Sequence, residues 1–95
     1  MGAVAERKPA RALLSDTANL VLLIVQELVN VPEDVEVVET AGEQTTLLEV
    51  RCHPEDIKHV IGRNGVTAEA IRHLLACLGA KERRDFVFKV LEARR

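Results

Sequence analysis

Hydrophobic residues dominate the stretch from residue 20 to 29, and their spacing predicts a helix. The residues at the spacing of one helix face are Leu20, Leu23, Ile24 and Leu28. Four further apolar residues widen this face: Val21, Leu22, Val25 and Val29. Ser15 or Asp16 suits the N-cap, and Pro32 disfavours helical backbone in the residue before it. A helix this apolar is either covered on most sides or holds another chain on one side.

Alternating apolar and polar residues on either side of Ala41–Gln44 predict a β-hairpin. The apolar positions are Val35 and Val37 before the turn, and Leu48, Val50 and Cys52 after it. A further alternating segment near the C-terminus predicts a closing strand, with one face formed by Phe86, Phe88 and Val90. Three strands are therefore expected.

A short helix is predicted after the hairpin. Pro54 suits a first helical position, and the acidic side chains of Glu55 and Asp56 favour a helix N-terminus. Gly62 should end this helix. Its inner face is expected to carry Ile57, Val60 and Ile61.

A longer helix is predicted after Gly65. Its apolar face recurs at i, i+3, i+4 and i+7, through Ile71, Leu74, Leu75 and Leu78. Gly79 should end it as the C′ residue. The element order is therefore α-β-β-α-α-β. This order predicts an α+β fold whose helices pack on one face of a small three-stranded mixed sheet.

The 95 residues suffice for one small domain. We expect residues 15–92 to form it, after a flexible lead-in at residues 1–14 and before a short tail at residues 93–95. Two Phe and no Trp or Tyr predict an aliphatic core and leave few rings for stacking bases. The longest apolar run, Leu20–Val25, falls far short of the roughly 20 residues that span a bilayer.

Charge is divided unevenly along the chain. Residues 1–50 hold nine acidic and three basic residues, a net charge of −6, whereas residues 51–95 hold six acidic and ten basic, a net charge of +4. A polyanionic partner should therefore meet the second half. No secretory signal precedes Cys52 and Cys77, which favours free thiols in the cytoplasm.

The segment Gly62–Gly65, between two predicted helices, is the strongest candidate for a functional site. Glycine at both ends removes Cβ atoms where a sugar-phosphate backbone approaches, and it permits the backbone angles of a sharp reversal. Arg63 and Asn64 should project outward, where the N-terminus of the following helix also favours a phosphate. Beside the loop, Ile57, Ile61 and side chains of the hairpin are expected to floor an aliphatic groove for bases.

Together with its flanks, this loop resembles the GXXG loop of KH domains, which clamps about four nucleotides of single-stranded nucleic acid. Over residues 17–92 the chain resembles the type II form, and most closely the small single-KH RNA-binding proteins of bacteria, the KhpA type. The residues that carry this resemblance are Asn30–Val37, Pro54–Asp56, Val60–Gly65, Ala68, Ala70–Arg72, Leu74 and Leu75.

The resemblance implies a type II KH fold in a cytoplasmic RNA-binding protein without catalytic activity, cofactor or metal. It also implies a role as RNA chaperone or post-transcriptional regulator, and a homodimer or a heterodimer with a larger KH-containing partner. The candidate RNA-binding residues are Gly62, Arg63, Asn64, Gly65, Lys58, Ile57, Ile61, Val66 and Arg72. Asn64 stands where the family usually has Gln, and Glu69, one turn from the loop, should repel phosphate and weaken binding.

Other functions stay open. A protein-interaction module of the same fold, docking a partner through the apolar first helix or the sheet, fits the net charge of −2 and the few aromatic residues. A metal site has no CxxC or HExxH spacing to support it; its candidate ligands are Cys52, His53, His59, His73 and Cys77. A Cys–His nucleophile lacks an oxyanion hole and an orienting third group. An enzyme is therefore the least expected class.

Overall fold

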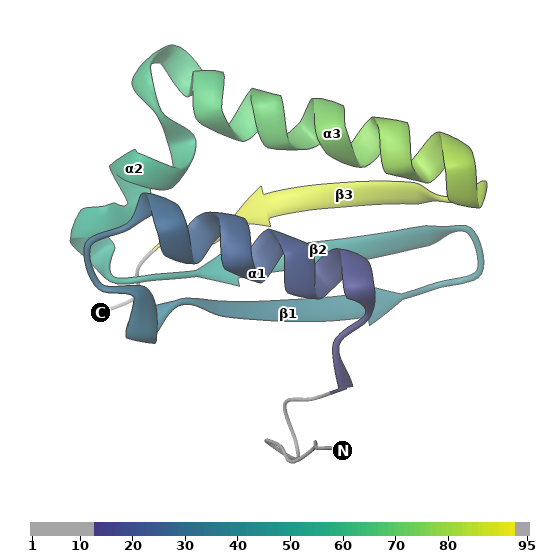
Figure 1. The fold of residues 1–95 in the computed structure, drawn as a ribbon, viewed down its shortest axis with the longest axis horizontal. Coiled ribbons are helices and arrows are strands. Elements are labelled where there is room, and N and C mark those ends of the chain that lie inside the picture. The colour runs from purple at the N-terminus through teal and green to yellow at the C-terminus, as the bar shows by residue number, and fades with distance from the viewer. Residues whose placement is uncertain (1–12, 93–95) are drawn as a thin grey trace.

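The structure is a computed structural model that describes residues 13–92 (Figure 1). Its helices and strands are α1 Asp16–Leu28, β1 Glu36–Ala41, β2 Thr45–Arg51, α2 Ile57–Ile61, α3 Val66–Glu82 and β3 Asp85–Val90. The predicted order α-β-β-α-α-β is confirmed. The expected lead-in, apart from Leu13 and Leu14, and the expected tail at residues 93–95 lie outside the described residues.

The three strands form a mixed sheet with β2 at its centre. β1 and β2 are antiparallel, with Val37 opposite Val50. β2 and β3 are parallel, with Leu48 opposite Phe88. The helices pack on one face of this sheet (Figure 1). The expected α+β fold is therefore confirmed, and the alternation of apolar residues correctly located all three strands.

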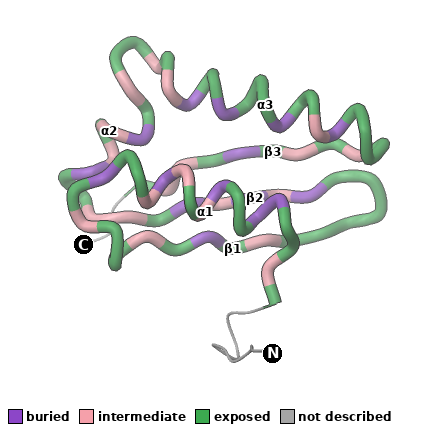
Figure 2. The backbone as a smooth tube through the Cα atoms, in the orientation of Figure 1, coloured by how far each residue is buried: buried purple, intermediate pink, exposed green. Residues whose placement is uncertain are grey.

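The core lies between the sheet and the helices, where one stripe of each helix faces the strands (Figure 2). The large side chains buried there are almost all aliphatic: Phe88, Leu48, Val21, Val25, Val50 and Val60. Burying such a side chain stabilises the fold by roughly 1.5–3 kcal/mol. The core is therefore aliphatic, as the composition predicts.

Helix α1 begins at a predicted N-cap, because the Ser15 hydroxyl accepts a hydrogen bond from the Ala18 N–H at 3.1 Å. Its packed face consists of Ala18, Val21 and Val25, which are all buried. The leucines whose helical spacing predicted the apolar face, Leu20, Leu23 and Leu28, are instead exposed, and Leu23 is 60% exposed. The small and β-branched residues therefore face the sheet, and one side of α1 presents leucine to solvent.

Helix α3 continues past Gly79 to Glu82, so the expectation that Gly79 ends it is wrong. Arg83 takes the left-handed position instead, with φ of 59°, and the Arg84 N–H bonds to the Gly79 carbonyl at 3.0 Å. Glycine is required at position 79 because the Arg84 carbonyl lies where a Cβ would stand. Leu74 was expected on the packed face but is 55% exposed. The packed face is Ala68, Ile71, Leu75 and Gly79.

Helix α2 follows a single 3-10 turn at Pro54–Asp56. Val60 faces the core and is fully buried, and Ile57 is half-buried, as expected for the inner face. Ile61 differs, because 37% of it is exposed. The last turn of α2 therefore presents an apolar side chain to solvent, immediately before Gly62.

The buried carboxylate of Asp56 ties α2 to the segment between α1 and β1. It accepts hydrogen bonds from the backbone N–H of Asn30 at 3.0 Å and of Val31 at 2.9 Å. Burial alone would raise the pKa of Asp56, but these two N–H donors outweigh it and lower the pKa below the ordinary 3.8. The ionised carboxylate is therefore the form that the fold favours.

Asp56→Asn should lower stability at neutral pH, because an amide has a single acceptor oxygen for the two backbone donors. The pKa of Asp56 is lower in the folded state, so its stabilising effect is present above the unfolded pKa, near 4, and is lost as the pH falls through the folded value. Urea unfolding at pH 7 and at about pH 3 measures both effects. The difference between wild type and variant should shrink at the lower pH, and an equal difference at both pH values would contradict this assignment.

Candidate nucleic-acid interface

The loop between α2 and α3 is a tight reversal in which three of four residues have positive φ. These angles are 82° at Gly62, 56° at Asn64 and 78° at Gly65. The Gly62 N–H bonds to the Lys58 carbonyl at 2.9 Å and ends α2, and the Gly65 N–H bonds to the Gly62 carbonyl at 3.1 Å. Asparagine adopts left-handed backbone more readily than most residues, so position 64 suits this conformation.

The two glycines of the loop have different surroundings. A Cβ at Gly62 would lie 2.7 Å from the backbone nitrogen of Thr67 and would overlap the Thr67 side chain. A Cβ at Gly65 would meet nothing within 4 Å. The absence of a Cβ at Gly62 is therefore explained by packing within the protein, and clearance of space for a ligand at Gly65 stays a prediction. Gly62 instead allows the end of α2 to pack against the start of α3.

Basic and polar side chains surround the loop. Arg63 and Asn64 are both exposed, as expected, and Lys58 is exposed one turn earlier on α2. Among residues 13–92, no carboxylate oxygen lies within 4.0 Å of the charged groups of Arg63 or Lys58. The N-cap residue of α3 is Gly65, which provides no side-chain cap, and the positive dipole end of this helix faces the same region. This end of the molecule thus favours an anion.

The first turn of α3 also carries Glu69, whose carboxylate is partly neutralised. Arg72 donates to it at 3.3 Å, and Nε2 of His73 lies 3.9 Å away. The Arg72 guanidinium also donates to the Phe88 carbonyl at 3.2 Å and lies 5.7 Å from the centre of the Phe88 ring. Arg72 therefore joins α3 to β3, and a contact between Arg72 and RNA stays a prediction.

Aliphatic side chains flank the loop on both helices. Ile61 on α2 is 37% exposed, Val66 on α3 is 65% exposed, and Ile57 is half-buried. The hairpin side chains do not join them, because Leu48 and Val50 are fully buried under the helices. The predicted groove thus has apolar residues from α2 and α3 alone, and β3 is the strand next to these helices (Figure 1).

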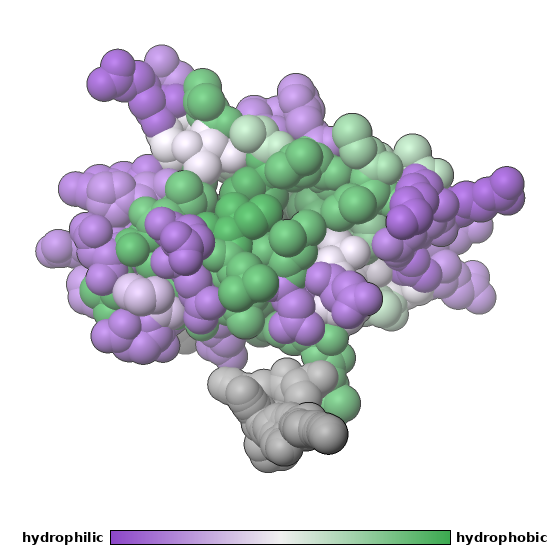
Figure 3. All heavy atoms as spheres, viewed as in Figure 1, coloured by the Kyte–Doolittle hydropathy of each residue, from purple (hydrophilic) through white to green (hydrophobic). Residues whose placement is uncertain are grey.

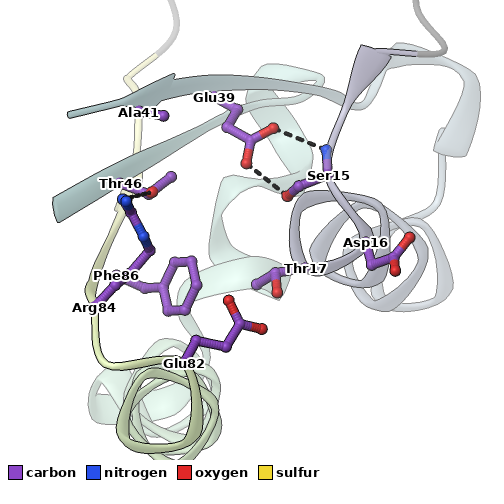
Figure 4. Close-up of a pocket in the computed structure, with 9 residues that line it drawn as sticks. All are labelled: Ser15, Asp16, Thr17, Glu39, Ala41, Thr46, Glu82, Arg84 and Phe86. Atoms are coloured by element: carbon purple, nitrogen blue, oxygen red, sulfur yellow. Dashed lines mark hydrogen bonds between the residues drawn. The ribbon is translucent and has the colours of Figure 1, made fainter. Parts of the chain in front are cut away.

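A cavity of about 350 Å³ lies at the other end of the molecule, between the start of α1 and the end of α3 (Figure 4). There the Ser15 backbone N–H and hydroxyl both donate to the Glu39 carboxylate, at 2.9 and 2.6 Å. Glu82 extends from α3 toward Thr17 of α1 (Figure 4). Sequence patterns did not predict this cavity because its walls come from segments far apart in the chain.

The cysteines and histidines do not form a shared site. Burial, with the carboxylates of Asp56 and Asp34 nearby, raises the pKa of the Cys52 thiol, which stays protonated at neutral pH. Among the described residues, no three His, Cys, Asp or Glu side chains come together as metal ligands. No helix within residues 13–92 is long and apolar enough to cross a bilayer.

The mixed sheet β1-β2-β3 under three helices, with a glycine-bounded loop between α2 and α3, defines a type II KH domain. The family model described as KhpA/KhpB, KH domain matches residues 18–90. The chain belongs to this family.

Three bacterial relatives have the name RNA-binding protein KhpA. The Clostridium perfringens protein is 40% identical over 76% of this chain and 96% of its own length. The Aquifex aeolicus protein is 35% identical over 83% of this chain and 100% of its own length. The Leifsonia xyli protein is 44% identical over 67% of this chain and 87% of its own length. The similarity thus covers most of the folded region.

Proposed function

We propose that this protein is a non-catalytic, cytoplasmic protein that binds single-stranded RNA through the loop Gly62–Gly65. The observation that carries this proposal is the exposed Arg63, beside the exposed Asn64 and the uncapped N-terminus of α3. A guanidinium and helix N–H groups both bind phosphate. RNA as the ligand is supported by the name of the three relatives, RNA-binding protein KhpA.

In this proposal, bases lie against the aliphatic side chains next to the loop. Ile57, Ile61 and Val66 contact bases, and Lys58 contacts the backbone of the RNA. Arg72 adds a contact from its position beside β3. Because aliphatic side chains hold bases less strongly than aromatic rings, one domain should bind about four nucleotides weakly and with little sequence selectivity.

A weak single site gains affinity when two domains are joined, since the second domain then binds at high local concentration. We therefore propose that the protein works as a homodimer or as a heterodimer with a larger KH-containing partner. A family model that joins KhpA and KhpB supports a KH-containing partner. The corresponding role is that of an RNA chaperone or post-transcriptional regulator.

A second candidate function is protein interaction through the helical face. Apolar side chains gather at the centre of this face, over α1 and toward α3 (Figure 3). The exposed large apolar residues of these two helices are Leu20, Leu23, Leu28, Val66 and Leu74. Exposed apolar patches frequently mark protein interfaces. In this alternative, the domain acts through a larger KH-containing partner and does not itself hold RNA.

Fluorescence anisotropy with labelled single-stranded RNA, and with DNA of matched sequence, distinguishes the two functions. We expect the folded wild type to bind RNA, with an affinity that falls as salt rises from about 50 to 200 mM, because bound phosphates release counterions. Absence of RNA binding by a protein with native circular dichroism would contradict the proposed function. That outcome would favour the protein-interaction module.

A further inference from the structure

Acidic side chains outnumber basic ones in the cavity between the start of α1 and the end of α3 (Figure 4). Three carboxylates line it, those of Asp16, Glu39 and Glu82. The single guanidinium is that of Arg84, so the charged side chains that line the cavity have a net charge of −2. Within residues 13–92, no Lys, Arg or His nitrogen lies within 4.0 Å of these carboxylates. The cavity therefore favours a cation.

The guanidinium of Arg84 is already used inside the fold. It donates hydrogen bonds to the Thr46 hydroxyl at 2.7 Å, to the Gly42 carbonyl at 3.2 Å and to the Glu43 carbonyl at 3.0 Å. These bonds hold it against the turn between β1 and β2. An anion would therefore compete with the fold for these donors, whereas the carboxylates can still accept hydrogen bonds from a cation.

Thr17 adds a buried polar group that has no partner among the described residues. Its side chain lines the cavity and only 7% of the residue is exposed. Within residues 13–92, its hydroxyl makes no hydrogen bond. Glu82 extends toward Thr17 from α3 (Figure 4). A buried hydroxyl without a partner costs free energy, so a donor that enters here gains hydrogen bonds to the hydroxyl and to the carboxylate.

The floor of the cavity is a row of residues across all three strands. Ala41 on β1 is opposite Thr46 on β2, and Thr46 is opposite Phe86 on β3. This row extends from the strand of Glu39 to the strand beneath the end of α3, where Glu82 lies. The distance is two strand spacings, roughly 10 Å. An extended 1,4-diamine with a charge-assisted hydrogen bond of about 2.8 Å at each end spans a similar length.

A single metal ion fits this arrangement less well than an elongated organic cation. Among the described residues, no three His, Cys, Asp or Glu side chains come together as metal ligands, so the carboxylates of the cavity are spread apart. A methylene chain also packs against the Phe86 ring, and an ammonium is attracted to the face of an aromatic ring. The volume of about 350 Å³ is at the lower end of the range for sites of small organic ligands, about 300–1,000 Å³.

We propose that this cavity binds an aliphatic diamine, or the diamine end of a longer polyamine. One ammonium lies between the Glu82 carboxylate and the Thr17 hydroxyl, and the methylene chain crosses the Phe86 ring. The second ammonium reaches Glu39, whose carboxylate accepts two hydrogen bonds from Ser15 and has lone pairs for about two more. The cavity and the loop Gly62–Gly65 lie at opposite ends of the molecule, so this inference does not depend on the proposed function.

A titration with 1,4-diaminobutane at constant ionic strength, followed by backbone amide NMR shifts, tests the site. We expect a Kd of about 1 mM, because so small a ligand makes few contacts. The amides of Thr17, Thr46 and Phe86 should shift and reach saturation. 1-Aminobutane lacks the second ammonium and should bind about threefold more weakly. 1,4-Butanediol has a similar length without charge and should leave these amides unmoved.

Two variants remove the polar contacts of the first ammonium. Thr17→Val keeps the branched shape without the hydroxyl and should weaken diamine binding about fivefold. Glu82→Gln removes an exposed carboxylate and should weaken binding about threefold. The matched control is Glu27→Gln, which makes the same change of charge at an exposed position of α1 outside the cavity. It should bind the diamine as the wild type does.

Three results would overturn the inference. Shifts of the three amides that do not saturate, or that 1,4-butanediol also produces, would mean that no defined site exists. An equal loss of affinity in Glu82→Gln and Glu27→Gln would mean that net charge alone attracts the diamine. Equal affinity for 1-aminobutane and 1,4-diaminobutane would exclude the contact of the second ammonium with Glu39.

Discussion

Arg63→Asp combined with Asn64→Asp is expected to lower RNA affinity by at least about tenfold and to flatten its salt dependence. The reason is local: the change places two carboxylates where phosphate is proposed to bind, at the N-terminus of α3. The logarithmic salt slope should become shallower by about 0.7 for each phosphate that the variant no longer neutralises. Anisotropy with short RNA at several salt concentrations measures both quantities. The fold should persist, because aspartate tolerates the left-handed backbone at position 64.

The matched control for this variant is Gln26→Glu combined with Lys81→Glu. It makes the same change of three charge units, but on α1 and at the far end of α3. If bulk charge governed binding, both double variants would weaken it equally. A loop variant that binds RNA as tightly as the control would exclude Gly62–Gly65 as the phosphate site.

Gly62→Ala is expected to lower the free energy of unfolding by about 3 kcal/mol or more. Its φ of 82° and ψ of 169° lie in a region that is essentially restricted to glycine. The added methyl group would also overlap Thr67. Small domains have about 5–15 kcal/mol of stability in total, so much of the fold's stability would disappear. Urea unfolding followed by circular dichroism measures this change.

Gly65→Ala is the matched control, because it adds the same methyl group three residues later. Its φ of 78° and ψ of 9° are near the left-handed helical region, and its Cβ would meet nothing within 4 Å. Gly65→Ala is expected to lower the free energy of unfolding by about 1–2 kcal/mol. Equal destabilisation of the two variants would contradict the distinct roles assigned to the two glycines.

Sequence patterns located the strands and the loop well because those signals are local. Alternation around Ala41–Gln44 was sufficient for the hairpin, and glycines at positions 62 and 65 marked the reversal between α2 and α3. The left-handed Asn64 also matches a conformational preference that is intrinsic to asparagine. These features required no knowledge of distant parts of the chain.

The face of α1 was not predictable in the same way. Apolar residues surround most of this helix, so the helical period does not single out one side. The sheet selects Ala18, Val21 and Val25, and Leu23 stays outside. The C-terminal end of α3 was not predictable from its sequence either. Gly79 is needed because the Arg84 carbonyl packs against it, and Arg83 is the residue with left-handed backbone that ends the helix. Both outcomes depend on packing that forms only in the folded chain.

The backbone of the loop also determines where its chemistry is free to vary. Positions 62, 64 and 65 have positive φ, which favours glycine and asparagine there and makes most other residues more costly. Position 63 is not among the positive-φ residues, so this restriction does not apply to its side chain. We therefore expect ligand preference at this loop to change, by natural variation or by design, mainly through the side chain at position 63. The other three residues hold the backbone that presents this side chain.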